Sequence, residues 1–251
     1  MKSLARLIVS AIVLSASTSF AAGGNGPAFH VNIDMDNRAS LQRGATLFVN
    51  RCLSCHSAQF SRYNRVADDL GIPQAVMEEN MIFTGRKFGQ TMTVAMTTEN
   101  ATEWFGAPPP DLSVKARARG ADWIYSFLKG YYVSEDSPRG VDNLMLPGTA
   151  MPHVLWDLQG YQALKAVDHQ DEHADSGHFA TPASPFELVQ EGKMTAVEYD
   201  RAMTDLVNYL VYMAEPAQLK RKSVGVGVLF FLAAFGVIAY FLKKEYWKDI
   251  H

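Results

Sequence analysis

Hydrophobic residues in this chain gather in two uncharged runs, one near each end. The C-terminal run, Val224 to Leu242, has no charged residue in 19 positions, which at about 1.5 Å per helical residue cover roughly 30 Å of bilayer. We predict one transmembrane helix there. The N-terminal run, Leu7 to Ser17, is shorter and follows two basic residues, and Ser19-Phe20-Ala21 has the small-x-small form of a cleavage site. Residues 1–21 are therefore predicted to be a secretory signal peptide.

A long amphipathic helix is predicted shortly before the transmembrane run. Thr195 and Glu198 form a capping box, and Pro216 ends the pattern. Between them, apolar residues recur at spacings of three and four, which places them on one helical face: Tyr199, Met203, Leu206, Leu210 and Met213.

Two shorter stretches also have helical spacing. The first is capped by Asn37 or Ser40, and Gly44 within it permits close packing. Its apolar stripe consists of Leu41, Ala45 and Phe48. The second follows Asp122 and ends at Gly130, with Trp123, Ile124 and Phe127 as its apolar positions. We predict a mainly α domain with long irregular loops over residues 22–219, followed by a membrane anchor over residues 220–251.

The charge of the domain differs from that of the whole chain. The full sequence has a net charge of −3, but residues 22–219 hold 15 Lys and Arg against 24 Asp and Glu, a net charge of −9. Such a field repels nucleic acid and favours a basic protein partner.

The orientation of the anchor follows from the signal peptide. Three basic residues flank each end of the span, so the positive-inside rule does not decide it: Lys220, Arg221 and Lys222 before it, and Lys243, Lys244 and Lys248 after it. An exported N-terminus places residues 22–219 in the periplasm and the tail from 243 to 251 in the cytoplasm.

The two cysteines of the chain lie in the sequence Cys52-Leu53-Ser54-Cys55-His56. CxxC followed directly by His is the attachment pattern of haem c, because two thioether bonds to the porphyrin hold the adjacent His56 under the iron as its proximal ligand. A disulfide here would close a very small loop. A thiol redox pair would need a βαβ setting, and a zinc site would need a second ligand pair. The sequence therefore favours one covalently attached haem.

The sixth iron ligand decides between a closed electron carrier and an open catalytic haem. Pro147, Gly148 and Pro152 restrict the backbone around Met151, as a loop that reaches across a haem face would require. A thioether opposite His56 would raise the reduction potential. Met145 and His153 are nearby alternatives by spacing alone.

Five blocks of the chain together resemble cytochrome c1, the haem c subunit of the cytochrome bc1 complex. They are Arg43-Gly44 with Cys52 to His56; Ala107-Pro108-Pro109-Pro110-Asp111-Leu112-Ser113; Arg117-Ala118-Arg119; Asn143 to Pro152; and Glu215-Pro216, Arg221-Lys222, Gly225, Tyr240, Lys243 and Trp247. CxxCH alone specifies only a c-type cytochrome. This ordered set, followed by a C-terminal anchor, is far more specific, and it runs through most of the mature chain.

The resemblance implies roles for particular residues. Met151 would be the distal iron ligand, and Arg119 would contact a haem propionate, for which a guanidinium is a well-matched partner. The helix that contains Trp123 would cover the haem edge, although packing in the core explains the same pattern. The helix that begins after Thr195 would cross the helix that precedes the haem motif, although packing elsewhere in the core explains the same pattern.

The resemblance also implies a function in a bacterial inner membrane. The chain would take one electron from a Rieske iron–sulfur protein and pass it to cytochrome c, beside cytochrome b in a dimeric ubiquinol:cytochrome c oxidoreductase. It would have no substrate chemistry of its own. Two alternatives are a tethered c-type carrier that serves another oxidase or reductase, and a haem enzyme with an open iron site.

Two stretches depart from the family pattern or add to it. Residues 70–102 form a shorter segment than in mitochondrial relatives, so a partner surface there cannot be transferred. His169 and His173 are four residues apart, with His178 beyond them, a spacing that would suit a metal on a helix. A charged, solvent-facing loop is the stronger interpretation, because Gly177 and Pro182 are close by.

Overall fold

Two crossing helices, α2 (Arg38–Leu47) and α9 (Ala196–Ala214), form the centre of the fold. In this computed structural model, which describes residues 28–165 and 184–248, they cross at Gly44, where an added Cβ would lie 2.0 Å from the Asp205 carbonyl oxygen. The close approach that Gly44 predicted is therefore present, and so is the crossing of the two helices. The predicted signal peptide and the stretch with His169, His173 and His178 lie outside the described residues.

The ends of these helices follow the sequence signals. The Asn37 side chain accepts a hydrogen bond from the Ser40 amide, so Asn37 is the cap of α2. Thr195 and Glu198 form both halves of the predicted capping box at the start of α9. The predicted apolar stripes of both helices are buried. Their burial against each other is the main source of stability for the pair.

A π-helix, η1 (Phe48–Cys52), continues α2 into the cysteine motif. The Leu53 amide donates to the Phe48 carbonyl at 2.9 Å, and the His56 amide donates to the Cys52 carbonyl at 2.8 Å. No sequence signal indicated this wider turn. Single π-turns of this kind are frequent at functional sites.

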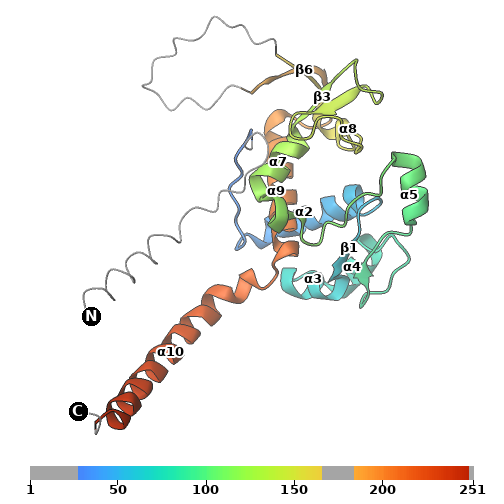
Figure 1. Cartoon of the computed structure of the whole chain (residues 1–251). Coiled ribbons are helices and arrows are strands. Elements are labelled where there is room, and N and C mark those ends of the chain that lie inside the picture. Colours follow the sequence, from blue (N-terminus) through green and yellow to red (C-terminus); the bar gives the residue numbers. More distant parts are fainter. Residues whose placement is uncertain (1–27, 166–183, 249–251) are drawn as a thin grey trace, which may run out of the picture.

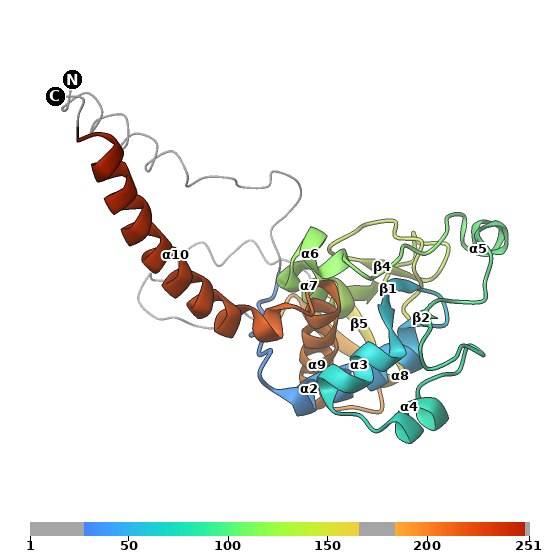
Figure 2. The same ribbon diagram turned by 90° about the horizontal axis from the view of Figure 1, so that it is seen from below.

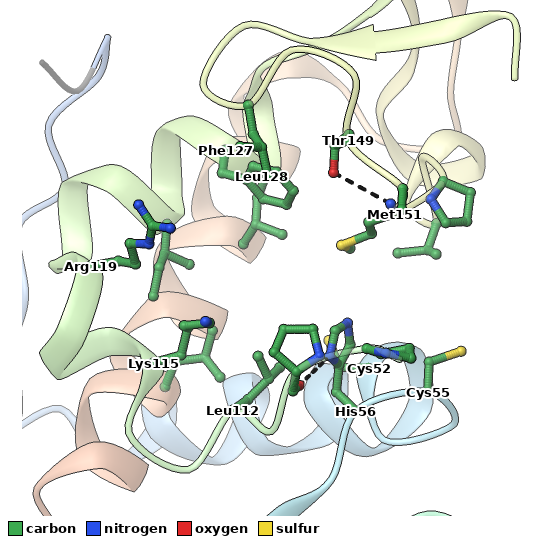
Figure 3. Close-up of a pocket in the computed structure, with 18 of the residues that line it drawn as sticks. Cys52, Cys55, His56, Leu112, Lys115, Arg119, Phe127, Leu128, Thr149 and Met151 are labelled. Atoms are coloured by element: carbon green, nitrogen blue, oxygen red, sulfur yellow. Dashed lines mark hydrogen bonds between the residues drawn. The ribbon is translucent and has the colours of Figure 1, made fainter. Parts of the chain in front are cut away.

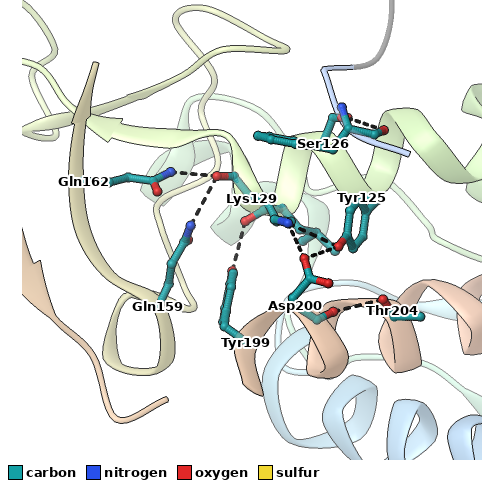
Figure 4. Close-up of polar contacts among 10 residues, drawn as sticks. Tyr125, Ser126, Lys129, Gln159, Gln162, Tyr199, Asp200 and Thr204 are labelled. Carbon is teal, nitrogen blue, oxygen red and sulfur yellow. Dashed lines mark hydrogen bonds and ion pairs between the residues drawn. The ribbon is translucent and has the colours of Figure 1, made fainter. Parts of the chain in front are cut away.

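Helices α6 (Lys115–Arg119) and α7 (Ala121–Lys129) pack beside α9. The predicted helix after Asp122 is thus confirmed, and it ends at Gly130. Figure 4 shows the polar contacts that join α7 to α9: Lys129 and Tyr125 both contact the Asp200 carboxylate, and the Tyr199 hydroxyl donates to the Leu128 carbonyl at 3.0 Å. These contacts hold α7 in a fixed position over α9.

Within residues 28–165 and 184–248, three two-stranded antiparallel sheets interrupt the loops, and no sequence signal indicated them. They pair β1 (Ala58–Arg62) with β2 (Thr91–Met92), β3 (Tyr131–Val133) with β4 (Val141–Asn143), and β5 (Gly160–Leu164) with β6 (Phe186–Glu191). The remaining short helices are α3 (Tyr63–Leu70), α4 (Gln74–Asn80), α5 (Thr98–Phe105) and α8 (Trp156–Gln159). The domain is mainly α with long connections, as predicted.

One long helix, α10 (Gln218–Tyr246), projects from the domain (Figures 1 and 2). Its segment Ser223–Tyr246 is long and apolar enough to cross a membrane, and it contains the predicted span at 224–242. The apolar side chains of this segment are exposed in the chain alone, which is expected of a surface covered by lipid or by other membrane helices. The helix begins before the predicted span, because residues 218–223 are helical as well.

Candidate haem site

A cavity of about 320 Å³ opens between the cysteine motif, α6, α7 and the loop before α8. This volume falls in the usual range of small-molecule sites. Apolar residues from several elements form most of its lining: Phe105, Pro108, Pro109, Leu112, Trp123, Ile124, Phe127, Leu128, Leu146, Val154, Leu206 and Leu210. The stripe of α7 predicted to cover a haem edge therefore faces this cavity.

Cys52, Cys55 and His56 lie on one side of the cavity (Figure 3). The His56 Nδ1 is 2.7 Å from the Pro110 carbonyl oxygen. Because a carbonyl can only accept, Nδ1 carries the proton and Nε2 keeps a free lone pair. Burial lowers the pKa of His56, while the Pro110 carbonyl acts in the opposite direction, so the imidazole is neutral. A neutral ring oriented by a carbonyl is the usual arrangement of a metal-binding histidine.

The cysteines do not have the features of a thiol redox pair. Both are free, and burial raises the pKa of Cys52 to about 12, whereas a reactive thiol needs a lowered pKa. Within the described residues, no group of three His, Cys, Asp or Glu side chains could hold a metal ion. A zinc site formed by the described residues is therefore excluded, and two thiols beside a neutral imidazole fit haem attachment.

Met151 lies on the opposite side of the cavity from His56, with its sulfur directed into the open space (Figure 3). The Tyr131 hydroxyl donates to the Met151 carbonyl at 3.1 Å, and the Met151 amide donates to the Thr149 hydroxyl at 3.4 Å. The two alternatives by spacing do not line the cavity. Met145 packs against the core, and the buried His153 ring stacks on Tyr131 at 4.8 Å between ring centroids.

Two cationic side chains of α6 line one edge of the cavity. Arg119 is exposed, and its guanidinium lies 4.8 Å from the centre of the Trp123 ring. Lys115 lies beside it (Figure 3). The sequence analysis missed Lys115, although its position four residues before Arg119 places both on the same helical face. Arg117 does not line the cavity.

The groups around this cavity match the needs of haem c. Two thiols and an imidazole lie on one side, a thioether lies opposite, apolar side chains surround the space, and two cations that could pair with carboxylates line one edge.

Two further contacts of the site were not predicted from the sequence: the Pro110 carbonyl at His56 and the ion pair of Arg51 with Asp157. Neither partner is signalled locally, because each lies more than 50 residues away in the chain.

Comparisons with known proteins give a consistent assignment. The model of the Cytochrome C1 family matches residues 29–250. Cytochrome c1 of Allochromatium vinosum is 44% identical and covers 98% of this chain and 99% of its own length. The ammonia monooxygenase gamma subunit of Nitrosomonas europaea is 41% identical, covering 98% of each chain. Among solved structures, a chain of a hyperthermophilic respiratory complex III matches over 100% of this chain and 100% of its own length, at 18% identity and a TM-score of 0.44. This structural similarity is too weak to support a fold assignment.

Proposed function

Because this chain belongs to the cytochrome c1 family, we propose that it carries a single covalently attached haem c and relays electrons from a Rieske iron–sulfur protein to cytochrome c. Membership of the family implies a haem cofactor, a role in respiratory electron transfer and a place in ubiquinol:cytochrome c oxidoreductase.

The observation that carries the proposal is the position of His56 and Met151 on opposite sides of one cavity, with Cys52 and Cys55 beside His56. The two cysteines would form the thioether bonds, His56 would be the proximal ligand and Met151 the distal one. When bound, haem c would supply one-electron transfer, and a thioether ligand from Met151 would raise its reduction potential. Arg119 would pair with a haem propionate, and Lys115 is placed to share this role.

The protein residues around the site hold and enclose rather than react. As the distal ligand, Met151 would occupy the position at which a substrate would otherwise approach, so the chain would favour electron transfer over oxygen or peroxide chemistry. Quinol oxidation would belong to cytochrome b, which α10 keeps alongside in the membrane. Two such assemblies would form the dimeric complex.

The orientation and charge of the domain support a basic acceptor. Residues 22–219 would face the periplasm and the tail after 243 the cytoplasm. The net charge of −9 on residues 22–219 would speed the encounter with a basic cytochrome c, and salt would screen this attraction. We expect the rate of electron transfer to fall as ionic strength rises. A constant rate would contradict the acidic docking face.

The ligand assignment is tested with the full-length, haem-loaded chain in detergent. Met151→Ala is expected to remove the charge-transfer band of methionine bound to ferric iron and to let the ferrous protein bind carbon monoxide. Met145→Ala is the matched control, because Met145 lies in the same loop without lining the cavity. Loss of the band in Met145→Ala alone would refute the assignment. Copurification with cytochrome b and a Rieske subunit separates this function from that of another tethered carrier.

A further inference from the structure

An ion pair between Arg51 and Asp157 crosses from the cysteine side of the cavity to the methionine side. We propose that this pair, the Arg51–Asp157 clamp, fixes the position of Met151 relative to His56, and that both members are positioning residues for the distal iron ligand. The proposal rests on the ligand assignment above and adds to it the device that keeps the sixth position closed.

The Arg51–Asp157 clamp is a bidentate ion pair. Arg51 Nη1 lies 3.0 Å from Asp157 Oδ1, and Arg51 Nη2 lies 3.0 Å from Asp157 Oδ2. A planar guanidinium and a carboxylate joined in this way resist both separation and rotation. The pair therefore restrains direction as well as distance.

Each member is rigidly connected to one side of the site. Arg51 lies in η1 and lines the cavity directly before Cys52. Asp157 lies in α8, six residues after Met151. Among the described residues, the only hydrogen bonds between residues 48–56 and residues 151–159 are the two that join Arg51 to Asp157. The clamp thus provides the direct polar link between the two ligand-bearing segments.

Both side chains of the Arg51–Asp157 clamp are partly buried. The side chain of Asp157 is 15% exposed and that of Arg51 is 32% exposed, so water screens this pair less than an ordinary surface pair. Lys193 also approaches Asp157, at 3.2 Å, but its side chain is 74% exposed. Burial alone would raise the pKa of Asp157, yet the bonds from Arg51 and Lys193 outweigh it and lower that pKa.

The backbone around Asp157 explains why the restraint reaches Met151. The Lys193 amide donates to the Asp157 carbonyl at 2.8 Å, and the Met194 amide donates to the Leu158 carbonyl at 3.1 Å. These bonds tie α8 to residues 193 and 194, just before α9, so α8 cannot turn freely about its own axis. The short connection from Met151 to α8 is itself hydrogen-bonded: the Val154 amide donates to the Pro152 carbonyl at 2.8 Å, and the Trp156 amide donates to the His153 carbonyl at 3.2 Å. Restraining Asp157 therefore also restrains the connection that carries Met151.

The test compares carbon monoxide binding by ferrous, full-length, haem-loaded variants. Asp157→Asn and Arg51→Lys are each expected to bind carbon monoxide about tenfold faster than wild type, because a charge-assisted pair of this kind is worth more than about 1.4 kcal/mol. Both should also weaken the charge-transfer band of methionine bound to ferric iron. Arg51→Lys keeps the charge and loses the fork, so its effect separates positioning from simple electrostatics.

Lys193→Gln is the matched control, since it removes the exposed partner of the same carboxylate and should leave carbon monoxide binding unchanged. Haem staining and thermal unfolding verify that each variant is loaded and folded. Wild-type binding rates in both Asp157→Asn and Arg51→Lys would overturn the clamp. If Met151→Ala itself binds carbon monoxide no faster than wild type, the distal-ligand assignment has failed instead, and the two failures are thereby distinguished.

Discussion

His56 and Met151 face the same cavity from supports of different kinds. His56 follows η1, which continues a helix packed into the core, and its ring is set by one backbone carbonyl. Met151 lies in a loop that is held by individual side-chain hydrogen bonds, among them those of Tyr131 and Asn143, in addition to the proposed Arg51–Asp157 clamp. The side of the cavity that bears His56, the proposed proximal side, is thus built from regular helix packing. The side that bears Met151, the proposed distal side, is built from individual hydrogen bonds.

This difference has a consequence for function. Helix packing distributes restraint over many contacts, so the backbone position of His56 does not depend on a single polar group, although one carbonyl sets the orientation of its ring. A loop held by a few bonds has a position that single substitutions can change. We therefore expect changes on the proximal side to affect haem attachment and folding, and changes on the distal side to affect the sixth ligand while the haem stays attached.

The largest effect on the proximal side is expected from the double variant Cys52→Ala with Cys55→Ala, which should abolish haem attachment. Without either sulfur no thioether bond can form, so we expect complete loss of the haem-stained band after denaturing electrophoresis. Met151→Ala is the control on the other side, and it should keep the band. A stained band at the chain's own mass in the double variant would show that the haem is attached elsewhere.

Gly44→Ala should disturb the helix pair that supports the proximal side. The new Cβ would meet the Asp205 carbonyl at 2.0 Å and the Tyr209 Cβ at 2.7 Å, so α2 and α9 must separate. Overpacking of this kind costs about 1–3 kcal/mol or more, which denaturant unfolding of the haem-loaded chain would measure. Gly89→Ala is the matched control, because its added Cβ meets nothing within 4 Å. Equal stability of the two variants would contradict the described crossing.

The same difference explains how much the sequence revealed. The capping box at Thr195, the stripe of α9 and Gly44 are local signals, and each corresponds to a feature of the structure. The haem motif is local as well, because its cysteines and histidine are adjacent in sequence. Met151 as the distal ligand stays a prediction, which rests on the restricted loop around it together with the family resemblance.

What the sequence did not reveal depends on contacts between distant residues. The Pro110 carbonyl reaches His56 across 54 positions, and Asp157 reaches Arg51 across 106. The strands are two to six residues long and pair with partners set by the rest of the fold. Strand pairing of this kind gives no alternating pattern long enough to recognise.

Asn143→Ala should loosen the frame of the distal loop. The Asn143 amide nitrogen donates to the Phe127 carbonyl at 2.8 Å, and its amide oxygen accepts from the Met145 amide at 2.9 Å. The side chain is fully buried, so both partners would be left unsatisfied, at a cost of about 2–3 kcal/mol. Unfolding should show this loss, and carbon monoxide binding should become faster.

Asn80→Ala provides the comparison for that change, because the Asn80 side chain is exposed and its single bond to the Val76 carbonyl is easily replaced by water. It should cost less than about 0.5 kcal/mol. If Asn143→Ala destabilised the chain while the methionine band and carbon monoxide binding stayed as in wild type, the loop would not depend on Asn143 for its position at the cavity.

Tyr131→Phe is expected to have a smaller effect on the distal side than Asn143→Ala. It removes one hydroxyl, which donates to the Met151 carbonyl, and leaves the stacking of the ring on His153 in place. Burial raises the pKa of Tyr131, so the hydroxyl stays protonated and donates throughout the physiological range. We expect a loss of about 1 kcal/mol and a carbon monoxide binding rate between those of wild type and Asn143→Ala, with haem attachment unchanged. Tyr132→Phe, the same change at a less buried neighbour, should have no effect on binding. An equal increase in both variants would mean that the hydrogen bond to Met151 does not hold the distal ligand.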